Sequence, residues 1–212
     1  MKSSEQFWDG IASRYAGMAV KDEESYRKKL EVTRRYFRPD WEVLEFGCGT
    51  GGTAIVHAPH VKHILAIDIS ARMLEFARSK AGQAGVQNIC FQQGTLDSLQ
   101  CNAESFDAVL GLNILHLLED VDAAVTRVYE LLKPGGIFVS STALIADAKL
   151  HWRLLIPIMQ CLGFAPYVNR FDKPQLLAML TGAGFRIDYE WQPSRESVFI
   201  VAKKGDANGV SD

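Results

Sequence analysis

The sequence lacks several features that would assign it to a class at once. Its four cysteines, Cys48, Cys90, Cys101 and Cys161, are scattered and form no Cys-x-x-Cys pair, which argues against a disulfide framework and a zinc site. No apolar run is long enough to span a membrane, and the residues after Met1 are polar, unlike a secretory signal. A net charge of −2 provides no overall field for nucleic acid. We therefore expect a cytoplasmic protein without a nucleic-acid partner.

The chain is long enough for one well-buried domain. Its 212 residues, 48% of them hydrophobic, fit a single globular unit better than two. We expect that unit to span residues 1–204, followed by a disordered tail at 205–212.

Apolar strand patterns alternate with helical patterns along most of the chain. A sheet built this way is parallel, with helices on both faces. The end of the chain differs, because the patterns at 185–191 and 197–203 are joined by a short turn, which predicts an antiparallel pair. The expected strands are 41–46, 64–67, 89–92, 106–112, 137–142, 185–191 and 197–203.

The strongest chemical signal is a glycine-rich turn at residues 47–52, directly after the apolar strand at 41–46. Glycine lacks a Cβ, so such a turn lets backbone N–H groups approach a ligand. Asp68 ends the next strand, at the position where a carboxylate accepts both hydroxyls of a ribose. These features fit any adenosine-containing cofactor, nicotinamide dinucleotides included.

Glu45 and two later segments favour one of these adenosine-containing cofactors. Glu45 starts the pattern Glu-x-Gly-x-Gly-x-Gly, Asp68 lies in Ala-Ile-Asp-Ile-Ser, and residues 132–136 read Leu-Lys-Pro-Gly-Gly. Together they resemble the class I S-adenosylmethionine-dependent methyltransferases, with looser similarity to the small-molecule and quinone-biosynthesis subgroup. The resemblance spans roughly residues 40–142. It implies an α/β fold with a Rossmann-like, seven-stranded, mostly parallel sheet whose last strand is antiparallel, and S-adenosylmethionine as cofactor with S-adenosylhomocysteine as product.

The resemblance also implies which residues hold the cofactor. The turn and Tyr15 would hold its methionine end, Asp68 the ribose, and Ile69 with its neighbours the adenine. The family usually has an acid where this chain has Thr95. The full set of expected cofactor residues is Tyr15, Glu45, Gly47, Cys48, Gly49, Thr50, Gly51, Asp68, Ile69, Met73, Gly94, Thr95, Leu96, Asn113, Ile114 and Leu115.

The acceptor is expected to lie near two segments outside the glycine turn. In the family, an N-terminal segment like 1–38 forms a helical lid over the cofactor. Residues 143–171 are too apolar for an exposed loop and predict a cap over a small, partly apolar acceptor. The expected acceptor contacts are Trp8, His151, Trp152 and Tyr167.

His116 is the candidate proton acceptor, because it follows a buried strand and has an ordinary pKa near neutrality. A lone histidine at a strand end more often has only a positional role. A His-x-x-His-x-x-His pattern at 57–63 is not expected to bind metal, because Pro59 prevents the three histidines from sharing a helix face.

Two other functions stay open. The basic helix at 22–38 would suit a phospholipid-headgroup methyltransferase on a membrane surface, although its glutamate-first i,i+4 pairs are typical of a solvated helix face. A non-catalytic sensor of the cofactor is the other alternative. The acceptor atom stays open, as does the choice between monomer and homodimer.

Overall fold

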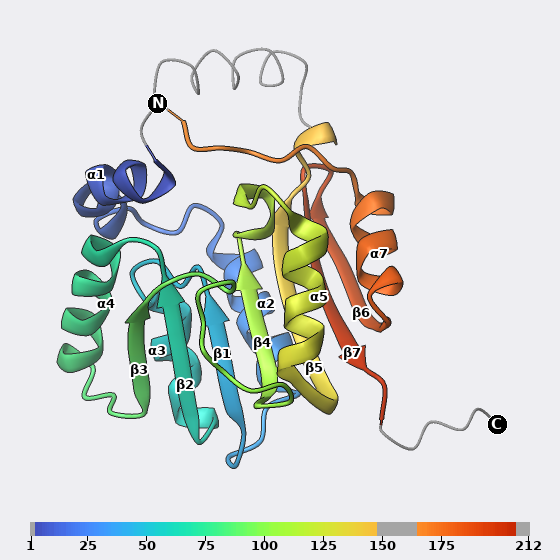
Figure 1. The fold of residues 1–212 in the computed structure, drawn as a ribbon. Helices are drawn as coiled ribbons and strands as arrows, with labels where there is room; N and C mark the ends of the chain where they lie inside the picture. The colour runs from blue at the N-terminus through green and yellow to red at the C-terminus, as the bar shows by residue number, and fades with distance from the viewer. Residues whose placement is uncertain (1–2, 148–164, 207–212) are drawn as a thin grey trace.

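The computed structural model describes residues 3–147 and 165–206. Within these residues the strands form a seven-stranded sheet in the order β3-β2-β1-β4-β5-β7-β6 (Figure 1). The strands are β1 Glu42–Phe46, β2 His63–Asp68, β3 Ile89–Gln93, β4 Phe106–Leu112, β5 Leu132–Ala143, β6 Phe185–Ser194 and β7 Ser197–Lys204. The helices are α1 Ser4–Ala16, α2 Glu23–Arg34, α3 Gly52–His57, α4 Ala71–Gln83, α5 Val121–Leu131 and α7 Lys173–Gly182, with short 3₁₀ turns η1 Ala58–His60, η2 Leu115–Leu117 and η3 Ile145–Asp147.

Strands β1 to β5 pair in parallel, and β7 runs antiparallel to both β5 and β6. This confirms the predicted sheet. The chain order reverses between β1 and β4, because β1 lies between β2 and β4. In open α/β sheets, ligands bind at the carboxyl ends of the strands beside such a reversal. We therefore expect a ligand site at the segments that follow β1, β2 and β4.

Polar side chains cap free N–H groups at the start of each described α-helix except α3. Ser70 Oγ accepts from Met73 N–H (3.1 Å) at α4, and Asp120 Oδ1 accepts from Ala123 N–H (2.8 Å) at α5. Such caps stabilise a helix start by about 1 kcal/mol. Ser70 closes the short loop after β2, and Asp120 closes the longer loop after β4 that contains η2, so both caps mark where loops at the carboxyl edge of the sheet end.

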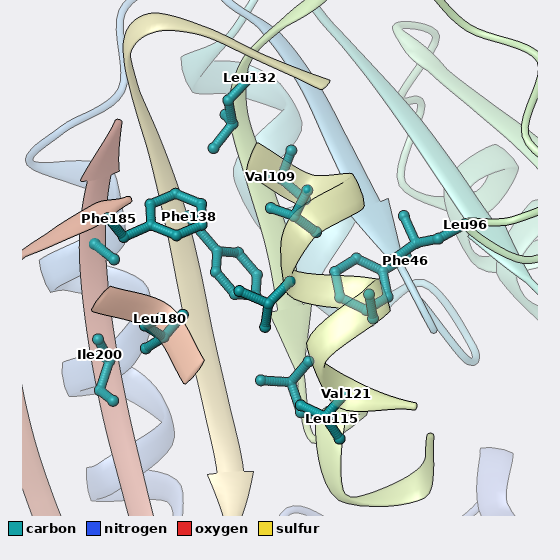
Figure 2. Packing of buried hydrophobic residues seen from close by; sticks show 14 of the residues in the cluster. Phe46, Leu96, Val109, Leu115, Val121, Leu132, Phe138, Leu180, Phe185 and Ile200 are labelled. Atoms are coloured by element: carbon teal, nitrogen blue, oxygen red, sulfur yellow. The ribbon is translucent and has the colours of Figure 1, made fainter. Parts of the chain in front are cut away.

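Apolar side chains fill both faces of the sheet. On the face covered by α5 and α7, Phe46 stacks on Phe138 with ring centroids 6.3 Å apart (Figure 2). Gly111 of β4 leaves the room for these rings, since a Cβ there would be 2.6 Å from Phe46. A second cluster, including Val43 and Phe199, fills the other face. Two-sided burial confirms the prediction of helices on both faces.

Helix α2 and strand β5 differ most from their predicted bounds. Helix α2 ends at Arg34 instead of Arg38, after burying Val32 and Thr33 against the sheet. Strand β5 begins at Leu132 instead of 137, and its pairing with β4 shifts register between Phe106 and Ala108. The Lys-Pro-Gly-Gly segment thus forms an irregular start of the strand, because it carries residues that interrupt regular pairing.

Helix α2 is a packed element of the domain. Its buried Val32 packs with residues of the sheet, and its exposed Glu31 pairs with Arg35, the residue directly after the helix, at 2.6 Å. Within 3–147 and 165–206, no helix is long and apolar enough to cross a membrane. The central part of the expected cap, 148–164, and residues 207–212 of the expected tail lie outside the described residues.

Candidate cofactor site

A cavity of about 450 Å³ opens at the carboxyl edge of the sheet, between the ends of β1, β2 and β4. Helix α1 lies at the same edge, beside α4 (Figure 1). The cavity brings together most of the predicted cofactor residues. Those that line it are Tyr15, Gly47, Gly49, Asp68, Ile69, Met73, Gly94, Thr95, Leu96, Asn113 and Ile114, and Trp8 of the predicted acceptor set lines it as well.

The glycine turn adopts a backbone that other residues rarely accept. Gly47, Gly49 and Gly51 have φ values of +64°, +53° and +72°. A Cβ on Gly47 would be 2.7 Å from Ile114, and a Cβ on Gly51 would be 2.9 Å from that of Ala77. Glycine is therefore required at both positions, by conformation and by space. The tight turn brings β1 close to the loop after β4, and the cavity lies between them.

Asp68 is held in one orientation by backbone donors. Its Oδ2 accepts from Gly49 N–H at 2.8 Å and its Oδ1 from Ser70 N–H at 2.9 Å. The residue is only 8% exposed, and burial raises the pKa of its carboxyl, an effect that these two hydrogen bonds oppose. Each carboxylate oxygen has further acceptor capacity. A fixed, cavity-lining carboxylate of this kind suits the paired hydroxyls of a ribose.

Glu45 lies below the turn and is 3% exposed. Its Oε2 has no hydrogen-bond partner among the described residues. Burial, with a smaller contribution from the negative charge of Asp68, raises the pKa of Glu45 to about 8. A buried acid with an unpaired oxygen is stabilised when positive charge arrives nearby. A positive charge near this carboxyl would lower its pKa again, although Glu45 itself does not line the cavity.

Helix α1 is attached to the cavity through Asp9. Its Oδ1 accepts from the Ser70 hydroxyl at 2.6 Å and from Arg72 N–H at 3.2 Å, at the start of α4. Trp8 and Tyr15 line the cavity from the same helix, with their rings edge to face at 6.2 Å. The predicted lid segment therefore contributes two aromatic side chains to the site.

Five of the predicted cofactor residues do not line the cavity. Besides Glu45, Cys48 and Leu115 are buried, Thr50 Oγ1 accepts from Lys80 Nζ at 3.0 Å, and Gly51 packs on Ala77. These residues shape the turn and its surroundings. The sequence shows only that these residues lie in or near the turn. It does not show whether a side chain there contacts the ligand or packs inside the protein, so the prediction included all of them.

Of the four predicted acceptor contacts, only Trp8 is found at the cavity among the described residues. Tyr167 is 42% exposed and does not line the cavity, and His151 and Trp152 lie outside the described residues. The sequence analysis also missed the wall formed by η2 and the start of α5. These cavity-lining residues are Leu117, Leu118, Glu119, Asp120, Ala123 and Ala124. The only signal for them was Asp120, whose helix cap places this segment beside β4.

His116 faces away from the site. It does not line the cavity, and its Nδ1 lies 3.2 Å from Thr142 Oγ1 and accepts from Ala143 N–H at 3.5 Å. Burial lowers its pKa to about 4. The structure thus places His116 as a link between the loop after β4 and strand β5, where the sequence analysis expected a proton acceptor.

Comparison with known proteins finds similarity to methyltransferases. Residues 43–136 match a family model described as a methyltransferase domain. The uncharacterized methyltransferase YcgJ of Bacillus subtilis is 38% identical over 137 residues, covering 65% of this chain and 50% of that protein. The ubiquinone biosynthesis O-methyltransferase of Methylocella silvestris is 32% identical over 145 residues, covering 66% and 56%. The chain therefore spans about half the length of the curated relatives it matches.

Solved structures share the fold. The YcgJ crystal structure superposes with a TM-score of 0.71 at 20% identity, covering 85% of this chain and 99% of that one. The [4+2]-cyclase SpnF superposes with a TM-score of 0.77 at 17% identity, covering 96% and 97%. A cyclase on this fold illustrates that the fold alone does not determine the reaction. The match at residues 43–136 includes the motifs at 45–51 and 68, so this part of the chain is similar to a methyltransferase domain.

Proposed function

We propose that the protein transfers a methyl group from S-adenosylmethionine to a small, partly apolar acceptor. One observation supports this best. The cavity combines the left-handed glycine turn, the fixed carboxylate of Asp68 and a slot between apolar side chains, all at the carboxyl edge of the sheet. The cofactor supplies a methyl group on a positively charged sulfur, which needs no further activation by the protein.

The residues of the chain then act by binding, orienting and excluding water. Asp68 holds a ribose through its two oriented oxygens. Ile69, Met73 and Leu96 provide apolar contacts for an adenine ring. Trp8 and Tyr15 cover the opening from α1. Positioning of the reacting atoms in a dry site supplies most of the rate in such a reaction.

The proposal is tested by an assay for transfer. The protein is incubated with S-adenosylmethionine labelled in its methyl group and a panel of quinols, phenols and hydroxylated acids. Labelled product that forms with the wild type, and not with Asp68→Asn, supports the proposal. Tight cofactor binding without turnover on any member of a broad acceptor panel favours the cofactor sensor instead.

Asp9 is predicted to matter for affinity although it does not line the cavity. Asp9→Ala removes the acceptor of two hydrogen bonds between α1 and α4, so α1 is held less firmly. We expect cofactor affinity to fall about 5-fold, consistent with losing one or two hydrogen bonds. Calorimetry with S-adenosylhomocysteine measures this. Glu24→Ala, an exposed acid in the neighbouring helix α2, is the control and should change nothing. Equal affinity in Asp9→Ala and wild type would show that α1 does not contribute.

His116 is predicted to be dispensable for the chemical step. Because its ring lies outside the cavity and its pKa is lowered to about 4, it is a weak base at neutral pH. His116→Gln keeps an acceptor for Ala143 N–H and should reduce kcat less than about 5-fold, well below the 100-fold or more typical of a general base. The assay above measures this once an acceptor is known. A 100-fold loss of kcat at unchanged thermal stability would restore His116 as the proton acceptor.

A further inference from the structure

A second cavity, of about 300 Å³, lies on the other side of the end of β4. Helices α2 and α3 and the β6–β7 hairpin enclose it. Leu112 and Asn113 line both this cavity and the cofactor cavity. The two cavities therefore meet at the residues where β4 ends.

Lys29 supplies a positive charge to the second cavity. Its Nζ donates to Ser141 Oγ at 2.8 Å, and the side chain is partly buried. Within the described part of the chain, no carboxylate lies within 4 Å of this ammonium. The nearby Asp22 raises the pKa of Lys29 less than burial lowers it, and Asp22 is engaged as the N-cap of α2. The ammonium thus has donors left for a ligand.

His57 provides an independent sign of a ligand. It is 1% exposed and lines the second cavity, yet neither ring nitrogen has a hydrogen-bond partner among the described residues. Buried polar groups are seldom left unpaired in native proteins. Burial lowers the pKa of His57 to about 4, so the ring is uncharged at neutral pH and offers one donor and one acceptor.

Asn113 connects the two cavities. It has a φ of +58°, which is uncommon for a residue other than glycine, and its N–H donates to the Ser141 carbonyl at 2.6 Å. The side chain of the same Ser141 accepts from Lys29. Strained backbone tends to occur at functional sites. A molecule anchored at Lys29 would thus reach towards the cofactor cavity past Asn113.

We infer that the second cavity binds the methyl acceptor, and that the acceptor is a small carboxylic acid whose carboxylate pairs with Lys29. This rests on the proposed function. Lys29 is the only lysine or arginine among the described residues that line this cavity, and Asp22 lines it too, so a doubly charged phosphate would meet one cation and one carboxylate. A ligand with a single negative charge, a carboxylate, suits this surface better than a phosphate does. Val20, Leu30 and Leu112 provide apolar surface for the rest of the molecule. The result is an amphipathic acceptor, apolar in its body and acidic at one end.

Matched acids and amides test this inference. The protein saturated with S-adenosylhomocysteine is titrated with benzoate, 4-hydroxybenzoate and octanoate, and with the corresponding amides. At least one acid should bind about 10-fold or more tightly than its amide, the effect of one charge-assisted contact. Lys29→Met should abolish this preference and Lys29→Arg should keep most of it. The control is Lys28→Met, because Lys28 lies on the same helix but packs over Trp191 at the surface.

The outcomes are distinct. If S-adenosylhomocysteine does not bind to the wild type, the proposed function fails. If it binds, but no acid binds better than its amide, or the preference persists in Lys29→Met, the inference about the acceptor is overturned. The acid–amide comparison on the wild type decides even if Lys29→Met does not fold.

Discussion

Replacing Asp68 with asparagine is expected to weaken binding of S-adenosylmethionine and S-adenosylhomocysteine about 100-fold. The carboxylate has one oxygen directed to Gly49 N–H and the other to Ser70 N–H, and it lines the cavity. An asparagine amide has one acceptor oxygen in place of two. Its NH₂ group would therefore face either a backbone N–H or the ligand hydroxyls with a donor where the carboxylate had an acceptor. Losing charge-assisted hydrogen bonds of this kind costs about 1.5–3 kcal/mol each, which supports the expected factor.

Calorimetry of the variant with S-adenosylhomocysteine measures this effect. Asp97→Asn is the matched control, since it removes the same charge from an exposed residue of the same cavity, and its affinity should change less than about 5-fold, as for a screened surface charge. Equal losses in both variants would show that the cavity needs negative charge in general. Unchanged affinity in Asp68→Asn would remove the ribose contact from the proposal.

Glu45→Gln is expected to stabilise the cofactor-free protein, and increasingly so as the pH rises. The folded state holds the pKa of Glu45 at about 8, above the 4.5 of an unperturbed glutamate. The folded protein therefore binds this proton more tightly than the unfolded chain does. The stability that results is complete below pH 4.5 and is lost as the pH rises through 8. Glutamine has no proton to lose, so the variant escapes the loss.

The advantage of the variant should reach roughly 2–4 kcal/mol near pH 8 and vanish near pH 4.5, on the scale of 1.4 kcal/mol per pKa unit. Thermal unfolding of both proteins across this range measures it. A constant difference in Tm at all pH values would contradict the raised pKa. We expect Glu45→Gln to bind the cofactor more weakly than the wild type, because glutamine cannot provide a negative charge beside the glycine turn.

Much of the fold could be predicted because local and global signals agree. Buried parallel strands such as β4 read as continuous apolar runs, and Ser70 and Asp120 mark helix starts directly. The bounds of α2 and β5 were wrong because they depend on packing and on a register shift. Neither leaves a local signature in the sequence.

The cofactor cavity was also largely predictable. Its glycines and Asp68 have a fixed spacing, because the backbone geometry they form is itself fixed. His116 does not line the cavity, because its position in η2 brings its ring to Thr142 and Ala143 of β5. Lys29, His57 and Ser141 come from three separate elements, and only the folded sheet shows that they share a cavity. No spacing along the chain links them.

The most direct measurement is calorimetric titration of the wild-type protein with S-adenosylmethionine, S-adenosylhomocysteine and NAD. All three carry an adenosine, so Asp68 and the glycine turn alone do not separate them. We predict micromolar binding of the first two, about −8 kcal/mol, and no detectable binding of NAD. Binding of NAD in the absence of binding by the other two would contradict the assignment of the cavity to S-adenosylmethionine.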